Sequence, residues 1–264
     1  MIDPRFSEAE LDDQREHITG FISDRLDAAG ADGAILGLSG GIDSTLTAHL
    51  AVEALGTGNV YGLVLPGEVS RDDNMSDAER VAEDLDISYD VIEIEPIVDT
   101  LVAAYPDAED DQLAVGNTRA RVRSVLNYLV ANHENRLVLG TGNRSEAAVG
   151  YFTKYGDGAV DCHPIGNLYK AQVRQLARHL GVSDELVDKT ATAGLWADQT
   201  DEDELGISYE LLDSILVAHI DGPLSVAATC RLLDIDPETV TAVREMYERS
   251  DHKRQAPPAP EPLV

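Results

Sequence analysis

Residues 39–44, SGGIDS, combine side chains and backbone types that suit the binding of an anion. They follow the short apolar run 34–38 and precede a stretch whose leucines recur at near-helical spacing, so they are expected to join a buried strand to a helix. A helix start presents unpaired N–H groups and the positive end of its dipole, and glycine lets a ligand approach the main chain closely. The alternative is an ordinary turn with Asp43 or Ser44 near the helix cap.

The common phosphate loops do not fit this segment. The Walker pattern requires a lysine, and no lysine precedes Lys154, while the G-x-G-x-x-G fingerprint lacks its later glycines. An aspartate such as Asp43 is compatible with a polyphosphate only if a divalent cation lies between them. The loop therefore indicates a nucleotide bound together with magnesium.

The composition limits the remaining classes. The chain has 264 residues, 43% of them hydrophobic, and a formal charge of −29 from 49 acidic and 20 basic residues spread along its length. A nucleic-acid-binding protein would carry a basic surface, so that class is disfavoured. No apolar run is long enough to span a membrane, and the polar N-terminus does not resemble a signal peptide. Two cysteines, Cys162 and Cys230, fit a reducing cytoplasm.

The acidity is typical of a protein from a halophile, although an acidic mesophilic protein is the alternative. In molar salt the Debye length is about 3 Å, so self-repulsion is screened. Dilute buffer is accordingly expected to unfold or dissociate the protein. The chain has only four lysines, Lys154, Lys170, Lys189 and Lys253, and such scarcity makes each a candidate for a functional role.

Strands and helices alternate through the first part of the chain. Strands are expected at 34–38, 60–65, 89–94 and 136–140, with helices at 77–85, 98–105 and 117–130. This alternation predicts an α/β fold, an open parallel sheet with helices on both faces, whose ligands bind at the carboxyl ends of the strands. Residues 39–44 and Thr141-Gly142-Asn143 should then share one edge.

The rest of the chain is expected to be mostly helical. Helices are predicted at 172–180, 208–220, 224–233 and 237–250, the acidic stretch 196–204 is expected to be mobile, and 255–264 is a Pro-rich flexible tail. We expect a single domain over 1–254. It comprises an N-terminal helix at 7–29, an α/β core at 33–170 and a helical C-terminal part at 171–254.

Residues 39–44 resemble the pyrophosphate-binding loop of the N-type ATP pyrophosphatases, whose adenine nucleotide alpha-hydrolase-like fold matches the predicted sheet. Residues 140–170, GTGNRSEAAVGYFTKYGDGAVDCHPIGNLYK, resemble the central signature of the NAD synthetases. So do GNTRARVR at 116–123, DEDELGISYE at 201–210 and SDHKRQAP at 250–257. The resemblance covers nearly the whole chain and implies a C–N ligase that amidates deamido-NAD to NAD, with ATP cleaved to AMP and pyrophosphate.

The resemblance also implies roles for individual residues. Asp43 and Glu146 match the family's Mg²⁺ ligands, and Asp43 and Lys170 match its catalytic residues, Lys170 as a mobile positive charge. A first-turn glutamate favoured by the helix dipole is the alternative for Glu146. The ATP-binding set comprises Gly37, Leu38, Ser39, Gly40, Gly41, Ile42, Asp43, Ser44, Thr141, Lys170 and Thr192.

A third set matches the family's contacts with deamido-NAD. Arginine suits phosphate because its donors form a fixed fork, whereas an aspartate is expected to contact a sugar or ring. Arg119 and Arg123 lie on other helix faces and are assigned no ligand, and Arg123 is expected to pair with surface carboxylates. The set comprises Arg121, Lys154, Asp161, His252 and Lys253.

One departure concerns residues 141–146, TGNRSE, where many bacterial relatives read TDHAAE. The histidine is absent, which leaves its role in doubt and the route of ammonia open, either free or delivered by a separate glutaminase. The short forms of the family use free ammonia and are homodimers, which we expect here. The alternatives are another adenylating amidotransferase or thiolase and a nucleotide-binding sensor that has lost catalysis.

Overall fold

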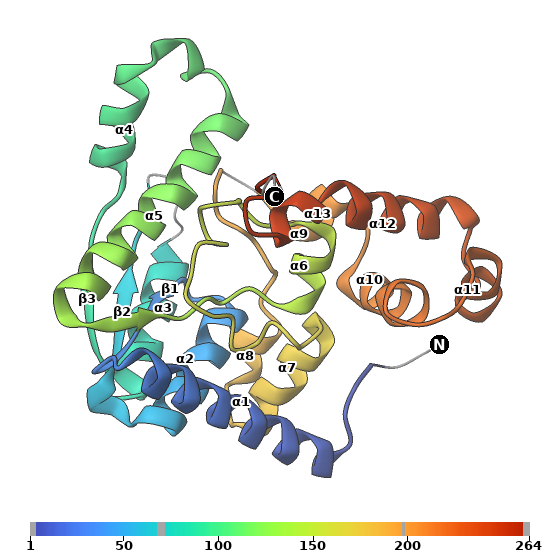
Figure 1. Cartoon of the computed structure of the whole chain (residues 1–264), viewed down its shortest axis with the longest axis horizontal. Helices are drawn as coiled ribbons and strands as arrows, with labels where there is room; N and C mark the ends of the chain where they lie inside the picture. The colour runs from blue at the N-terminus through green and yellow to red at the C-terminus, as the bar shows by residue number, and fades with distance from the viewer. Residues whose placement is uncertain (1–3, 68–71, 197–198, 261–264) are drawn as a thin grey trace.

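The chain is built around a four-stranded parallel sheet in the order β3-β2-β1-β4 (Figure 1). The computed structural model describes residues 4–67, 72–196 and 199–260. The strands are β1 (Gly33–Leu38), β2 (Val60–Val64), β3 (Ser88–Val91) and β4 (Arg136–Val138). The inner strand β1 pairs with β2 through Ala34–Val60 to Leu38–Val64 and with β4 through Gly33–Arg136 to Ile35–Val138.

Both faces of the sheet are covered, which explains why the central strands read as continuous apolar runs. On one face, Leu36 and Leu38 pack with α1 (Glu8–Ala29), α2 (Ile42–Leu55), α3 (Asp72–Asp84) and α7 (Lys170–His179). On the other, Ile35 and Leu63 pack with α4 (Glu95–Ala104) and α5 (Gln112–Glu134). The predicted fold class, a parallel sheet with helices on both faces, is confirmed.

Two long helices have capping residues at both ends. Helix α1 begins at the capping box formed by Ser7 and Glu10 and ends at Gly30, which is left-handed. Helix α5 begins at Asp111, whose side chain accepts from the Ala114 N–H group, and ends at a left-handed Asn135. Helices α4 and α5 project beyond the sheet as an antiparallel pair (Figure 1).

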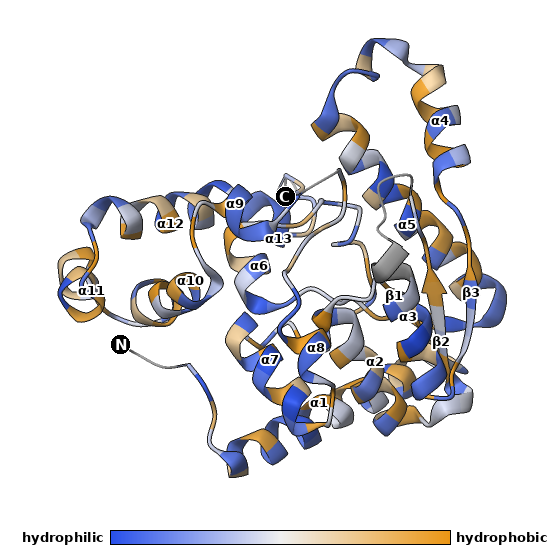
Figure 2. Ribbon diagram, turned by 180° about the vertical axis from the view of Figure 1, so that it is seen from behind, coloured by the Kyte–Doolittle hydropathy of each residue, from blue (hydrophilic) through white to orange (hydrophobic). Residues whose placement is uncertain are grey.

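A second group of helices follows the core. It includes α6 (Arg144–Val149), α8 (Asp184–Val187), α9 (Asp201–Leu205) and α10 (Tyr209–Ile215), which continues into a π-helical turn at Leu216–Ile220. Helices α11 (Val226–Leu233), α12 (Pro237–Arg249) and α13 (Asp251–Arg254) complete it. Apolar side chains of α6, α9, α10, α11 and α12 form a separate cluster around Leu212, Ile215 and Val240, whereas Leu186 and Val187 of α8 pack with α1 and α2. Helices α10, α11 and α12 lie together on the side of the molecule away from the sheet (Figure 2).

Two expectations about secondary structure were wrong. The third strand ends at Val91. The Ile92 and Ile94 N–H groups still donate to the Val64 and Pro66 carbonyls, but Ile94 already has a helical conformation as the N-cap residue, and α4 starts one residue later. The acidic stretch 196–204 contains the start of α9, where Thr200 caps the helix and Asp201 is 4% exposed. That part of the stretch is ordered structure, not a mobile loop. Residues 197–198, and residues 261–264 of the predicted tail, lie outside the described residues.

No helix in the described part of the chain is both long and apolar enough to cross a membrane.

Candidate active site

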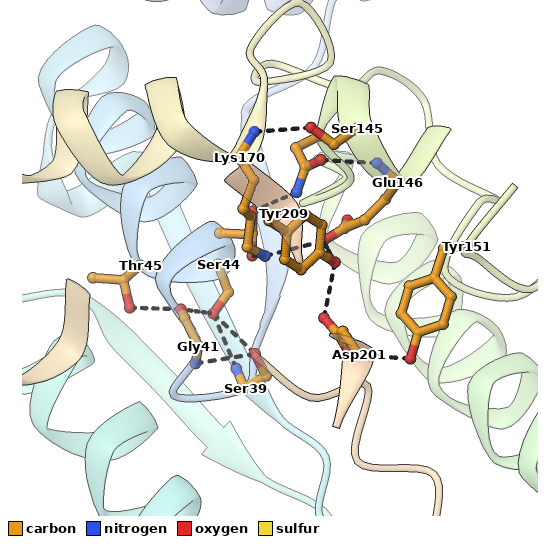
Figure 3. A network of polar contacts seen from close by, with 12 residues as sticks. Ser39, Gly41, Ser44, Thr45, Ser145, Glu146, Tyr151, Lys170, Asp201 and Tyr209 are labelled. Atoms are coloured by element: carbon orange, nitrogen blue, oxygen red, sulfur yellow. Dashed lines mark hydrogen bonds and ion pairs between the residues drawn. The ribbon is translucent and has the colours of Figure 1, made fainter. Parts of the chain in front are cut away.

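The glycine loop, residues 39–44, turns from the end of β1 into the start of α2, as predicted (Figure 3). Gly40 has a φ of +70°, which a residue with a side chain adopts only at a cost, and Gly41 is the extended N-cap residue. The hydroxyl groups of Ser39 and Ser44 lie 3.1 Å apart, and Ser39 accepts from the Gly41 N–H group at 3.3 Å. The loop therefore gathers N–H and hydroxyl donors at a helix N-terminus, which is the arrangement that binds phosphate.

An ion-pair cluster lies beside the loop at the carboxyl edge of the sheet. Lys170, at the start of α7, places its Nζ atom 2.6 Å from Asp43 Oδ2 and 3.0 Å from Glu146 Oε1. The Lys170 side chain is only 2% exposed, and the two carboxylates are 18% and 16% exposed. Three predicted site residues from three different helices are thus in direct contact.

The cluster corrects one expectation, that Lys170 supplies a mobile positive charge. Its ammonium group is buried and held by two carboxylates. Burial works to lower the pKa of Lys170, but Asp43 and Glu146 outweigh it and raise that pKa, so the residue carries its charge. Burial raises the pKa of Glu146, against the opposing effect of the Lys170 ammonium group.

Asn143 is a site residue that the sequence reasoning missed. Its Nδ2 atom donates to Asp43 Oδ1 at 2.8 Å, and its Oδ1 atom accepts from the Glu146 N–H group at 3.0 Å, which caps α6. The side chain is completely buried. Asn143 lies in the segment between β4 and α6 and is the N-cap residue of α6, where asparagine is favoured, and this was the available signal.

Another carboxylate, the fully buried Asp213 of α10, is hydrogen-bonded to the helices that carry the cluster. Its two oxygen atoms accept from the Ser145 hydroxyl group at 2.5 Å and from the Ala171 N–H group at 2.9 Å. Ser145 in turn accepts from the Lys170 N–H group at 2.9 Å. Asp213 thereby joins the N-termini of α6 and α7, which carry Glu146 and Lys170. Burial raises its pKa to about 6.

Two tyrosines line the same cluster (Figure 3). The Tyr209 hydroxyl group contacts Glu146 at 3.2 Å and donates to Asp201 Oδ2 at 2.9 Å, and its ring lies 4.8 Å from Lys170 Nζ. Tyr151 donates to Asp201 Oδ1 at 3.1 Å. Burial raises the pKa of Asp201. Neither Tyr209 nor Asp201 was assigned from the sequence, although both lie in the quoted segment 201–210.

The donor set at this cluster fits a magnesium ion. Asp43 and Glu146 converge on one cationic group, so their oxygen atoms are already arranged around a positive charge, and Mg²⁺ prefers oxygen ligands supplied by one or two carboxylates plus phosphate and water. Within the described residues, no group of three or more histidine, cysteine, aspartate or glutamate side chains is arranged to hold a metal ion by itself. A site of this kind depends on a phosphate-bearing partner to complete it.

The remaining residues of the predicted ATP set contribute main-chain groups near the loop or hydroxyl groups outside the ion-pair cluster. Leu38 and Ile42 are 4% and 5% exposed and direct their side chains into the core, so only their main chains can meet a ligand. Thr141 follows β4, and the Thr192 hydroxyl group accepts from the Gly194 N–H group at 3.1 Å.

Four of the five residues matched to deamido-NAD contacts lie together. Arg121 donates to the Lys154 carbonyl at 3.3 Å, and the Lys154 ammonium group donates to the His252 carbonyl. Lys253 donates to the Gly150 and Phe152 carbonyls at 2.7 and 2.8 Å. Gly150 has a φ of +72°, and a Cβ atom there would lie 2.2 Å from the Ser250 Cβ atom, so glycine is required for the segment before α13 to pack here.

Asp161 is placed differently from the other four. It accepts from the Tyr128 hydroxyl group at 3.1 Å and from the Val138 N–H group at 2.8 Å, on the α5 side of β4. Its exposed position leaves room for a ligand, but its described contacts are structural.

The expectation for Arg123 was wrong. Its Nε atom donates to the Leu65 carbonyl at 2.9 Å, and burial lowers its pKa to about 10, so it is not paired with a surface carboxylate. Its neighbour Arg119 pairs with Glu95, with Nη2 at 2.6 Å from Oε1. Arg123 thus connects α5 to the residue after β2, and Arg119 connects α5 to the start of α4.

A parallel sheet with a glycine loop after its first strand, and carboxylates converging at the same edge, defines a nucleotide-binding α/β protein of the ATP pyrophosphatase type. The protein-family model described as NAD synthase matches residues 14–257. The chain belongs to the NAD synthase family.

Individual relatives agree with this assignment. The chain is 61% identical over 259 residues to an NH3-dependent NAD+ synthetase of Halobacterium salinarum, covering 98% of this chain and 97% of the relative. Among solved structures it resembles NMN synthetase from Francisella tularensis, with a TM-score of 0.83, 35% identity and coverage of 97% and 99%. It also resembles the NH3-dependent NAD synthetase from Campylobacter jejuni, with a TM-score of 0.80, 31% identity and coverage of 95% and 99%.

Proposed function

We propose that this protein is a ligase that amidates deamido-NAD to NAD with ammonia, consuming ATP and releasing AMP and pyrophosphate. The observation that carries the proposal is the contact of Asp43 and Glu146 with one buried ammonium group directly beside the glycine loop. The names of the relatives, NH3-dependent NAD+ synthetases at up to 61% identity, supply the substrate pair.

The reaction requires activation because a carboxylate does not accept ammonia. The substrate carboxylate attacks the α-phosphorus of ATP, pyrophosphate leaves, and the resulting NAD-adenylate reacts with ammonia to give the amide and AMP. Asp43 and Glu146 would hold Mg²⁺, which supplies neutralisation of phosphate charge. Ser39, Ser44 and the N–H groups of the loop hold the phosphates in place.

The cationic side chains near Lys154 are expected to bind the dinucleotide. Arg121, Lys154 and Lys253 now donate to main-chain carbonyls, and a phosphate offers each a charge-assisted bond that is stronger than the one it replaces. We therefore assign Arg121, Lys154, His252 and Lys253 to deamido-NAD, and Asp161 to a sugar or ring contact. Thr141 and Thr192 are assigned to ATP.

We further propose a homodimer formed by the projecting pair α4 and α5. In a chain of charge −29, this pair exposes Val125 and Leu129 one turn apart on α5, at 66% and 63%. Leu101 and Tyr105 on α4 are 49% and 66% exposed at the same helical spacing. Exposed apolar side chains gathered on an otherwise acidic surface are typical of an interface. The free cysteines, Cys162 and Cys230, fit a cytoplasmic setting.

The test is an incubation with ATP, deamido-NAD and ammonium chloride in multi-molar KCl, followed by chromatography of the nucleotides. NAD and AMP in equal amounts are expected. AMP released only with another acceptor would identify a different adenylating enzyme, and nucleotide binding without turnover would identify a sensor. Replacing ammonium by glutamine tests the nitrogen source, and little product is expected.

The likeness to an NMN synthetase favours one competing substrate. The mononucleotide analogue of deamido-NAD should therefore be offered in parallel. A kcat/KM higher for the mononucleotide than for the dinucleotide would assign the protein to that activity instead.

A further inference from the structure

Lys189 is the lysine that neither the sequence motifs nor the proposed mechanism uses. It lies between α8 and α9, and its Nζ atom is 3.5 Å from the Gly40 carbonyl oxygen in the glycine loop. It also forms an ion pair with Asp77 of α3. A lysine far from the loop in sequence is thus placed at the turn where phosphate is expected to bind.

The glycine loop needs a cation from elsewhere, because residues 39–44 contain no basic side chain. Lys170 is held by Asp43 and Glu146 and is 2% exposed. The Lys189 side chain is 26% exposed, and its Nζ atom reaches the loop at the Gly40 carbonyl. Lys189 therefore has the access to an incoming anion that Lys170 lacks.

The partner of Lys189 does not depend on it. Asp77 also pairs with Arg80, whose Nη2 atom lies 2.9 Å from Asp77 Oδ1. When Lys189 turns toward a phosphate, Asp77 keeps a cationic neighbour. The charge on Asp77 is then not left uncompensated, which would otherwise oppose the movement.

We propose that Lys189 is a further catalytic residue, whose ammonium group binds the β- and γ-phosphates of ATP at the glycine loop and stays with the pyrophosphate that leaves. The assignment rests on the proposed function. The substrate carboxylate oxygen bonds to the α-phosphorus, the bond from that phosphorus to the bridging oxygen breaks, and the electron pair stays on pyrophosphate. Lys189 stabilises the charge that develops there.

The test compares Lys189→Met with Asp77→Asn, since both remove the ion pair but only the first removes the ammonium group. Steady-state rates and the binding of inorganic pyrophosphate by calorimetry are measured in multi-molar KCl, with far-UV circular dichroism as the check on folding. Lys189→Met is expected to lower kcat/KM for ATP and the affinity for pyrophosphate by about 10- to 100-fold, as for a lost charged hydrogen bond. Asp77→Asn is expected to stay within about threefold of wild type, and Lys189→Arg to recover part of the loss.

The outcomes separate the alternatives. Equal losses in Lys189→Met and Asp77→Asn would overturn the proposal, because the ion pair would then be a structural link between α3 and the 188–192 segment. Unchanged pyrophosphate affinity in a folded Lys189→Met variant would also overturn it.

If wild-type protein binds pyrophosphate through Lys189 but forms no NAD, the proposed function fails and the assignment of Lys189 to the diphosphate stands. If Lys189→Met does not fold, Lys189→Arg against Asp77→Asn decides: pyrophosphate affinity altered only by Lys189→Arg supports the proposal, and equal change contradicts it.

Discussion

The two ends of the candidate active site hold their charged groups in different ways. At the ATP end, Asp43, Glu146 and Lys170 contact one another and are supported by the buried side chains of Asn143 and Asp213. At the deamido-NAD end, cationic side chains donate to main-chain carbonyls at the surface. The first arrangement is a connected side-chain network, and the second is a set of separate contacts.

The difference indicates how each end responds to its ligand. The side chains of a buried network are held in position before the ligand arrives. Removing one of them therefore disturbs the orientation of the others. Cations bound to carbonyls exchange one acceptor for another, so each contributes separately to binding. Changes at the ATP end should therefore lower kcat, and changes at the other end should raise the KM for deamido-NAD.

The largest effect is expected for Asp43→Asn. The change removes a charge from the network with little change of shape, so NAD formation should fall by about 10³-fold or more while the fold is retained. Rates by chromatography and far-UV circular dichroism check this, with Asp188→Asn at an exposed ion pair as the matched control. Collapse of the spectrum would show that Asp43 is structural.

A smaller loss is expected for Asn143→Ala. The variant leaves Asp43 without its amide donor and removes the cap of α6, so both carboxylates lose their orientation. Activity should fall by about 10- to 100-fold, as for other residues that orient metal ligands, and the Mg²⁺ concentration for half-maximal rate should rise. Thr229→Val, at a buried hydroxyl group on α11, controls for loss of a buried polar group. An unchanged Mg²⁺ dependence in Asn143→Ala would contradict the positioning role.

At the other end, Arg121→Gln should raise the KM for deamido-NAD by about tenfold or more and leave the KM for ATP near its wild-type value. Arg121 is exposed, and its described hydrogen bond is to the Lys154 carbonyl, so the fold should be unaffected. Steady-state kinetics with each substrate varied in turn distinguish the two constants. A rise in both would show that the two ends are not independent.

The smallest effect concerns the pH dependence of stability. Burial raises the pKa of Asp213 to about 6, so the folded state binds this proton more tightly than the unfolded state does. The contribution of Asp213 to stability is therefore greatest below its ordinary pKa and is lost as the pH rises through 6. The free energy of unfolding of wild type relative to Asp213→Asn should fall by about 1–3 kcal/mol between pH 4 and 7. Denaturant titrations of both proteins measure it, and a constant difference would show that Asp213 is not perturbed.

The fold could be predicted from sequence because each central strand is a continuous apolar run bounded by turns, and each helix has a periodic apolar face. The end of β3 could not, because Ile92 and Ile94 continue the apolar pattern and their N–H groups still bond to the Val64 and Pro66 carbonyls, so the sequence does not mark where the chain leaves the strand. The helix that starts at Asp201 was not predicted, because its acidic residues are typical of a mobile surface segment. Burial raises the pKa of Asp201, and the Lys170 ammonium group and the hydroxyl groups of Tyr209 and Tyr151 oppose that rise.

Asp43 and Glu146 could be named from the sequence because each follows a strand or belongs to a motif, and the structure brings both side chains into contact with Lys170. Sequence reasoning did not assign Asn143 or Asp213, whose hydrogen-bond partners lie 100 and 42 residues away in the sequence, and it marked Lys189 only by the scarcity of lysine. The sequence also predicted a mobile Lys170. Its burial between two carboxylates arises only where the three helices that carry these residues come together in the fold. The spacing of residues within one segment carries no information about contacts between different helices.

The attachment of the chain's beginning to α7 has a consequence for biosynthesis. Gln175 of α7 accepts from the Phe6 N–H group at 2.8 Å and donates to the Phe6 carbonyl at 2.6 Å, and Gln172 donates to the Pro4 carbonyl. On the ribosome, at 5–20 residues per second, these partners emerge roughly 10–30 s after residue 6. The side of α1 that packs on α7 stays uncovered for that time, so slowing translation between the two segments should prolong exposure of the nascent chain to chaperones and proteases.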